Sequence, residues 1–403
     1  MYLKRVGIIF LISFFLCYSV SFSVYISIPT WSEGTTETSA IEEGKDNFLD
    51  LESEAAILIE QNSGEILYEH NIHEQLRPAS VTKVMTILLI MEEIDSGRLS
   101  FDDMISCSEN ASSMGGSQIW LDTTEQLSVS DMLKAICVVS ANDCTVAMAE
   151  HIAGSEEAFV DRMNERAKEL GMNDTVFKNC HGIDEDGHVT SCYDISVMSR
   201  ELLTKHPKIT EYTTIWMDSL RGGQSELVNT NKLIRNYSGA TGLKTGSTSL
   251  ALFNLSASAT RDNLSLIAVI MRAPSTAIRF SEAKKLLDYG FSNYQYNEFA
   301  RGGEFFNRIE VQKGMNQYVD VKYEKDAGYI LKKGSENNVE SEIVIDSSIM
   351  APVSRGQKVG EIMFKSGDVL IDSVNLIADN DVKKISTWNM ITYLYREWFD
   401  LMR

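Results

Sequence analysis

Three short motifs place nucleophilic, basic and amide side chains at spacings that could support covalent catalysis. The first is Pro78-Ala-Ser80-Val-Thr-Lys83. Residues three apart share one helix face, so the serine hydroxyl and the lysine amine can meet. Because burial disfavours an ammonium ion, a buried Lys83 can be neutral and accept the serine proton, and the helix N-terminus favours negative charge near Ser80. Alone, the motif is also consistent with an ordinary exposed helix start.

The second motif is Ser140-Ala-Asn142, which lies between the apolar segments 132–139 and 145–152. Its hydroxyl could relay a proton, and its side-chain amide could hold a substrate carbonyl. Serine and asparagine at a junction between helices are also common helix caps.

The third motif is Lys244-Thr245-Gly246, just before an apolar hairpin. Gly246 allows another group to approach the strand backbone closely, and the two preceding side chains could bind an anionic group. The alternative is a glycine-rich strand entry with a solvated lysine. The motifs S-x-x-K, S-x-N and K-T-G, in this order, form the set found in penicillin-binding proteins and class A β-lactamases.

Hydrophobic periodicity predicts the elements that must position these motifs. Ser128-x-x-Asp131 resembles a capping box and predicts a helix from about Ser130. Phe159, Met163 and Ala167 recur at helical spacing. The expected elements are a hairpin of 55–60 and 65–68, helices at 78–91, from 130 and at 156–170, and an antiparallel pair of 250–259 and 264–271.

The C-terminal part of the chain has two further patterns. Residues 303–382 contain short strands with turn signals, which predicts a small all-β domain. In residues 385–403, apolar side chains fall on one helix face beside basic residues, which favours an amphipathic helix at a membrane surface. A helix docked on the protein's own body is the alternative. The apolar positions are Trp388, Ile391, Leu394, Tyr395, Trp398, Leu401 and Met402, and the basic residues are Lys383, Lys384, Arg396 and Arg403.

The N-terminus indicates export. A basic segment, Met1 to Arg5, precedes an apolar core at residues 8–18, as in a signal peptide. We expect a signal peptide at 1–23, cleaved after Ser21 or Ser23, with an uncleaved anchor as the alternative. Residues 24–50 include a polar stretch that is rich in Ser, Thr, Glu and Asp and is typical of a flexible spacer.

Composition narrows the class of protein. The 403 residues carry 37 Lys and Arg against 57 Asp and Glu, a net charge of −20, which argues against nucleic-acid binding. Five of the six cysteines follow the signal, without a C-x-x-C pair, so neither a disulfide framework nor a zinc site is favoured and most are expected to be buried. No metal-binding spacing is present, and no cofactor is expected. The histidines His181 and His188 favour structural roles, because no G-x-S-x-G elbow accompanies them.

On these motifs the chain resembles the low-molecular-mass penicillin-binding D-alanyl-D-alanine carboxypeptidases, from about Ala55 to the C-terminus. One departure is Ala251-Leu252, where the family commonly has Ala-Gly, and it is expected to affect local strand packing or substrate preference. Other matching segments are Gly115-Gly-Ser-Gln-Ile-Trp-Leu121, Ser140-Ala-Asn-Asp143, Phe159-Val-x-x-Met-Asn164, Leu170-Gly-Met-Asn-Asp-Thr175, Asn179-Cys-His-Gly182, Gly187-His188, Asn229-Thr-Asn-Lys232, Ala351-Pro-Val353 and Gly356-Gln-Lys-Val-Gly360.

The resemblance implies an α+β fold: a β-lactamase/transpeptidase-like domain at 51–295, a small all-β domain at 300–384 and the amphipathic helix at 385–403. It implies a serine-type carboxypeptidase that removes the terminal D-alanine from peptidoglycan pentapeptides. The implied roles are nucleophile for Ser80, general base for Lys83, proton relay for Ser140, amide orientation for Asn142, carboxylate binding for Lys244 and Thr245 beside Gly246, and an oxyanion hole of the Ser80 and Thr248 amides.

The same resemblance implies which molecules the protein binds and where in the cell it is located. It implies peptidoglycan stem peptides as substrates, β-lactam antibiotics as covalent inhibitors, and peripheral attachment to the outer face of the cytoplasmic membrane through the C-terminal helix. A β-lactamase is disfavoured because no E-x-x-L-N segment follows the second motif. A D,D-endopeptidase that cleaves cross-links and a non-catalytic wall-binding scaffold remain as alternatives.

Overall fold

The computed structural model describes residues 47–334, 339–345, 347–366 and 369–386, together with 388, 390–392, 395, 398, 399 and 402. The expected signal peptide and nearly all of the expected spacer therefore lie outside the described residues. The expected C-terminal helix lies partly outside them.

An antiparallel sheet forms the centre of the N-terminal part of the described chain, with strand order β2-β1-β9-β8-β7. The β1–β2 hairpin and the β8–β9 pair confirm the two antiparallel pairs expected from the sequence. β7, which carries the third motif, is an edge strand of this sheet. The strands are β1 (Ala55–Glu60), β2 (Ile66–His70), β7 (Ala240–Thr248), β8 (Leu252–Arg261) and β9 (Leu264–Ala273).

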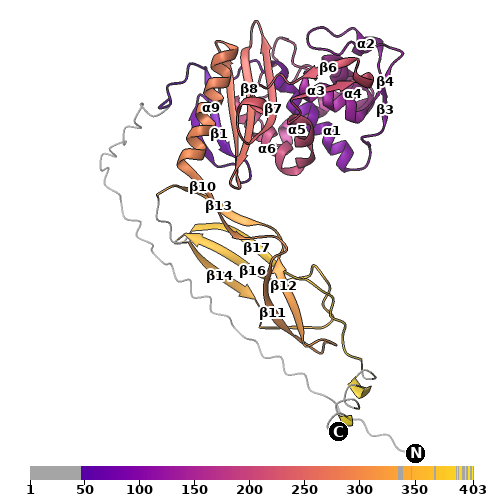
Figure 1. The fold of residues 1–403 in the computed structure, drawn as a ribbon, viewed down its shortest axis with the longest axis vertical. Helices are drawn as coiled ribbons and strands as arrows, with labels where there is room; N and C mark the ends of the chain where they lie inside the picture. Colours follow the sequence, from indigo (N-terminus) through magenta and orange to yellow (C-terminus); the bar gives the residue numbers. More distant parts are fainter. Residues whose placement is uncertain are drawn as a thin grey trace, which may run out of the picture. The chain divides into compact units, whose positions relative to one another are not determined.

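Helices cover both faces of this sheet (Figure 1). Side chains alternate between strand faces, and every residue of β1 is buried, which explains its continuous apolar sequence. Ala55, Ile57 and Ile59 pack into the larger core, with α1 and its neighbouring helices. Ala56 and Leu58 face the opposite way, into a core that α9 closes.

The helices of the described residues confirm the three predicted from periodicity. Helix α3 begins at Val129, one residue before the expected start, and the Ser128 hydroxyl caps it by accepting from the Asp131 amide at 3.1 Å. The α-helices are α1 (Lys83–Asp95), α2 (Glu109–Ser112), α3 (Val129–Val138), α4 (Asn142–Ala153), α5 (Glu156–Glu169), α6 (Cys192–Lys205), α7 (Thr210–Thr213), α8 (Leu233–Asn236) and α9 (Thr276–Asn293). Short 3₁₀ turns are η1 (Ala79–Thr82), η2 (Pro207–Ile209) and η3 (Arg221–Gly223), and two small hairpins are β3 (Met104–Ser106) with β4 (Gln126–Ser128) and β5 (Met217–Leu220) with β6 (Ser225–Val228).

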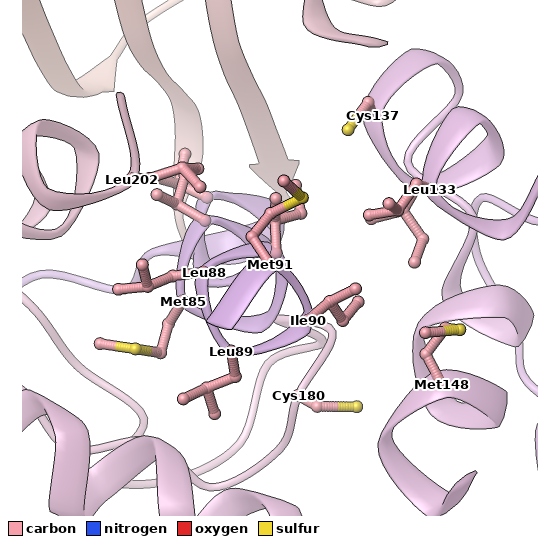
Figure 2. Close-up of a cluster of buried hydrophobic side chains, with 14 of the residues drawn as sticks. Met85, Leu88, Leu89, Ile90, Met91, Leu133, Cys137, Met148, Cys180 and Leu202 are labelled. Carbon is pink, nitrogen blue, oxygen red and sulfur yellow. The ribbon is translucent and has the colours of Figure 1, made fainter. Parts of the chain in front are cut away.

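Helix α1 runs through the larger core and fixes the first motif. Its sequence is apolar on nearly all sides because other helices surround it, as Leu133 of α3, Met148 of α4 and Leu202 of α6 show in Figure 2. Each such buried side chain contributes about 1.5–3 kcal/mol. All five cysteines of the described chain are buried, as expected, and Cys137 and Cys180 belong to the same core.

The C-terminal part of the described chain is all β, as its turn signals predicted. A sheet of order β14-β16-β17-β12-β11-β15 has its own apolar core, and β10 pairs with β13. These strands are β10 (Tyr294–Ala300), β11 (Phe305–Gln312), β12 (Tyr318–Tyr323), β13 (Ala327–Lys332), β14 (Val339–Ile345), β15 (Ser348–Met350), β16 (Lys358–Ser366) and β17 (Val369–Ala378).

The amphipathic helix at 385–403 is not confirmed and stays a prediction. The side chains of Trp388, Ile391 and Trp398 are exposed, but residues between them lie outside the described set. No helix within the described ranges is long and apolar enough to cross a membrane.

Candidate active site

The first motif brings Ser80 and Lys83 into direct contact. Ser80 lies in η1, and Lys83 is the first residue of α1. Their side chains are joined by a hydrogen bond of 3.1 Å between the lysine Nζ and the serine Oγ. The chain just before η1 is held from β8, where the Asn254 side-chain amide donates to the carbonyls of Arg77 and Pro78 at 2.8 and 3.0 Å. The serine is therefore fixed from both the helix and the sheet.

The Lys83 amine has two further, shorter hydrogen bonds. It donates to the side-chain oxygen of Asn142 and to the backbone carbonyl of His181, each at 2.6 Å. Among the described residues it forms no salt bridge with a carboxylate. A neutral amine has two N–H donors and one lone pair, so these two acceptors can take both donors and leave the lone pair for the Ser80 hydroxyl. The geometry thus suits a lysine that accepts a proton.

The electrostatic surroundings of Lys83 also favour its neutral form. The side chain is fully buried, and burial lowers its pKa well below the usual value. The positive charge of Lys244 lowers it further, whereas Cys180 and Asp143 act in the opposite direction. Desolvation is the largest of these causes, so the lowered pKa of Lys83 is a consequence of where α1 begins in the core.

Asn142 connects the second motif to Lys83. It is the first residue of α4, and its side chain also donates to the Gly115 carbonyl at 2.7 Å. Its backbone amide donates to the Ser117 carbonyl at 2.7 Å. The side-chain oxygen therefore points to Lys83 in a fixed orientation, set by the loop that contains residues 115–117.

The His181 carbonyl is a member of the site that motif reasoning missed. Its loop is fixed at Cys180, whose carbonyl accepts from the Thr86 hydroxyl at 2.6 Å. Gly182 has φ +89°, and a side chain there would overlap the Ala79 carbonyl oxygen. Burial is the main cause that lowers the pKa of the His181 ring, to about 3. The sequence signals were the glycine that follows this histidine and the matching segment Asn179-Cys-His-Gly182 that contains both residues.

The third motif faces Ser80 from the edge strand β7. A side chain at Gly246 would lie 2.8 Å from the Ser80 amide nitrogen, so only glycine allows this approach. Lys244 is 1% exposed, which makes the solvated-lysine alternative wrong. Burial lowers the pKa of Lys244 to about 7, and its amine donates to the Thr245 carbonyl at 3.0 Å. The Thr245 hydroxyl donates to that of Thr230 at 2.8 Å.

Ser140 is the predicted site residue with the weakest set of contacts. It adopts φ +66° between α3 and α4, and it is 4% exposed. Its hydroxyl has no hydrogen-bond partner within the described part of the chain. Neither Ser140 nor Lys244 is hydrogen-bonded to Ser80 or Lys83 there, so the proton-relay and carboxylate-binding roles stay predictions.

A serine hydroxyl held against a buried lysine without an acidic partner defines a serine hydrolase of the serine–lysine type. No group of three or more His, Cys, Asp or Glu residues that could hold a metal ion occurs in the described ranges.

Comparisons with known proteins identify the family of serine hydrolases to which the chain belongs. A family model described as D-alanyl-D-alanine carboxypeptidase matches residues 39–275, and one for the C-terminal domain of penicillin-binding protein 5 matches 294–384. The D-alanyl-D-alanine carboxypeptidase DacF of Bacillus subtilis is 42% identical over 87% of this chain and 90% of its own. The chain therefore belongs to the D-alanyl-D-alanine carboxypeptidase family, a family of serine peptidases that bind penicillin and act on peptidoglycan.

Solved structures agree with this assignment. Penicillin-binding protein 5 from Haemophilus influenzae is 30% identical, with a TM-score of 0.65 over 83% of this chain and 98% of that chain. Penicillin-binding protein D2 from Listeria monocytogenes in its ampicillin-bound form is also 30% identical, with a TM-score of 0.56 over 60% of this chain and 99% of that chain. The first of these supports the mixed fold with its C-terminal β domain.

Proposed function

We propose that this protein removes the terminal D-alanine from peptidoglycan pentapeptides through an acyl-enzyme on Ser80. The observation that carries the assignment of residues is the buried Lys83 amine, whose two short hydrogen bonds go to Asn142 and His181 while its third contact is the Ser80 hydroxyl. This is the arrangement that a neutral general base requires.

The reaction follows from this geometry. The Ser80 Oγ–H proton passes to the Lys83 Nζ as the Oγ–C bond forms at the substrate carbonyl. The C–N bond to the terminal D-alanine then breaks, and the proton is delivered to the leaving amine. Water then attacks the ester carbonyl while Lys83 takes a proton from it, the acyl C–Oγ bond breaks, and the proton returns from Lys83 to the Ser80 Oγ, which restores the free enzyme. A β-lactam would acylate Ser80 in the same way.

The remaining site residues are assigned to substrate binding. Lys244 and Thr245 hold the terminal carboxylate from β7, Asn142 orients the scissile amide, and Ser140 relays the proton to the leaving group. The Ser80 amide and the Thr248 amide form the oxyanion hole, and the proximity of Gly246 to the Ser80 amide supports an oxyanion site between η1 and β7.

Release of D-alanine from a soluble pentapeptide tests this proposal, together with labelling by a fluorescent penicillin. Ser80→Ala should abolish both, a loss on the order of 10⁴-fold or more. Ser63→Ala, a substitution at a polar turn outside the site, should change neither. A Ser80→Ala protein that releases D-alanine at the wild-type rate would refute the assignment. Labelling without D-alanine release, but with cleavage of cross-linked dimers, would identify an endopeptidase instead.

The chain's organisation is the second part of the proposal. The matched segments 39–275 and 294–384 support a peptidase domain at 51–295 and a β domain at 300–384. Residues 1–23 act as a cleaved export signal, and residues 385–403 attach the enzyme peripherally to the outer face of the cytoplasmic membrane. The exposed side chains of Trp388, Tyr395 and Trp398 support this attachment.

Deletion of 385–403 tests the attachment, once the mature N-terminus has been sequenced. The shortened enzyme should become soluble and keep its activity on small peptides. If the processed, shortened enzyme still sediments with membranes, the segment is not the anchor.

A further inference from the structure

Trp120 is presented to solvent in a backbone conformation that bulky residues rarely adopt. Its side chain is 77% exposed, the largest value among the exposed large hydrophobic residues of the described chain, and its φ is +61°. An unfavourable conformation of this kind persists only where the surrounding structure fixes it, and such residues cluster at functional sites. The exposed indole therefore needs an explanation from its surroundings.

The residues on either side of Trp120 are fixed to α4. Ile119 and Leu121 are 5% and 4% exposed, so the chain is held in the core on both sides of the tryptophan. Both backbone amides donate to the Asp143 carboxylate, at 3.1 and 3.0 Å. The carboxylate thus bridges the residue before the indole and the residue after it.

A second clamp comes from the turn between β5 and β6. The Arg221 guanidinium donates to the carbonyls of Ile119 at 2.8 Å and Trp120 at 3.4 Å. The same guanidinium binds both oxygens of Glu125, at 2.6 and 2.7 Å. Two charged groups from different elements therefore fix the backbone that presents the indole.

The loop that contains Trp120 also positions a residue of the candidate active site. Asp143 follows Asn142 in α4, and Asn142 binds Lys83 and also the carbonyls of Gly115 and Ser117. A loop that positions Asn142 thus presents Trp120 only three residues further on. The loop that holds Asn142 in the candidate active site therefore also carries the exposed indole.

The chemistry around the indole favours a neutral, hydroxyl-rich ligand. Near Trp120 in the chain, Ser117, Thr123 and Thr124 are exposed and carry hydroxyl groups. The exposed Asp122 carboxylate accepts from the Thr124 amide at 2.8 Å and from its hydroxyl at 2.6 Å, and Arg221 and Glu125 pair with each other. A flat apolar ring with hydroxyl groups and a carboxylate acceptor near it suits a sugar ring, which is apolar on its C–H face and has hydroxyl donors at its edge.

We propose that Trp120 is a stacking platform for a sugar ring of the glycan strand that carries the stem peptide. This inference rests on the proposed function, because it takes the bound polymer to be peptidoglycan. Trp120 is then a specificity-determining residue that distinguishes polymer-linked peptides from free ones and takes no part in bond cleavage.

The test compares D-alanine release from a free pentapeptide and from the same peptide on a glycan oligomer. Trp120→Ala and Trp120→Gly should raise KM for the glycan-linked substrate about tenfold, with kcat unchanged. Both should leave kcat/KM for the free peptide within about twofold of the wild type. Glycine adopts a positive φ without strain, so a higher KM of the Trp120→Gly variant reports the missing indole and not a strained backbone at residue 120. Trp120→Phe should retain most of the preference, and Phe305→Ala, which removes an exposed ring of the β domain, should retain all of it.

A binding measurement separates this inference from the proposed function. Calorimetry with peptide-free glycan oligomers should detect binding to the wild type that Trp120→Ala and Trp120→Gly weaken to a similar degree. A wild type that binds the oligomers but releases no D-alanine would refute the proposed activity and leave the platform standing. Equal losses on free and glycan-linked peptides, or unchanged oligomer binding by the variants, would overturn the platform.

Discussion

The helix side and the strand side of the active site each bury one lysine, and the two lysines differ in their hydrogen-bond partners. Lys83 on α1 contacts Ser80, Asn142 and the His181 carbonyl. Lys244 on β7 has, within the described chain, one hydrogen bond of its amine, to the Thr245 carbonyl, so other donors remain for a substrate carboxylate. Burial lowers both pKa values, so the partners rather than the burial support the proposed roles, Lys83 as the base and Lys244 as the binding cation.

The two lysines also support each other's roles. A charged Lys244 lowers the pKa of Lys83, because like charges in a buried site repel. Binding of a substrate carboxylate beside Lys244 would favour its charged form. The comparison therefore predicts that arginine, a permanent cation, blocks acylation when it replaces Lys83 but keeps much of the activity when it replaces Lys244.

Lys83→Arg should have the largest effect. Arginine stays protonated and cannot take the Ser80 proton, so acylation by a fluorescent penicillin should fall on the order of 10⁴-fold. Stopped-flow labelling measures the rate, and the circular dichroism spectrum checks the fold. Acylation of Lys83→Arg at a rate comparable with the wild type would show that another group is the base.

Lys244→Arg should have a smaller effect because it keeps the positive charge. We expect KM for a pentapeptide to rise about tenfold or less, whereas Lys244→Gln, without the charge, should lose about 100-fold in kcat/KM. Steady-state D-alanine release measures both. Equal acylation rates for Lys83→Arg and Lys244→Arg would contradict the division between the two sides.

The pH dependence of kcat/KM should sharpen this division. Lys244 must be charged to bind a carboxylate, and its pKa is about 7, so kcat/KM should fall as the pH rises above about 7. Lys83 must be neutral, and its lowered pKa keeps it neutral to lower pH than an ordinary lysine, so activity should fall on the acid side. Lys244→Arg should remove the alkaline fall and keep the acid one. An alkaline limb that is unchanged in this variant would exclude Lys244 as its origin.

The smallest predicted effect concerns Leu252, at the start of β8 on the strand side. It adopts φ +55°, a conformation that suits the glycine common at this place in the family. The free energy of unfolding of Leu252→Gly should therefore be higher than that of the wild type, or lower by no more than about 1 kcal/mol. Leu255→Gly, at a fully buried position of the same strand, should lose more than about 3 kcal/mol. Urea denaturation measures both, and equal losses would show that the backbone at 252 is not strained.

Local patterns were enough to predict much of the fold and one contact of the site. The three-residue spacing of Ser80 and Lys83 predicted their contact because a helical turn fixes it. The apolar runs predicted β1, β8 and β9, and the spacing of Phe159 and Met163 predicted α5. These features depend on neighbours within a few residues along the chain.

Features that depend on distant backbone groups could not be predicted in this way. The His181 carbonyl reaches Lys83 from 98 residues away, and a carbonyl leaves no mark in the residue type. The burial of Lys244 follows from packing around the edge strand, which its own sequence does not report. Asp143 was visible only as a neighbour of Asn142, although its carboxylate fixes the loop that presents Trp120.

The central claim, that Lys83 is the neutral base, is tested most directly by following its own titration. NMR of protein labelled at the lysine side chains, with the Lys83 signal assigned by its loss in Lys83→Arg, gives the pKa of this amine. We predict a pKa well below the ordinary lysine value of about 10.4, with Lys83 neutral at the pH of maximal acylation. A Lys83 signal that titrates at the ordinary lysine value would contradict the account.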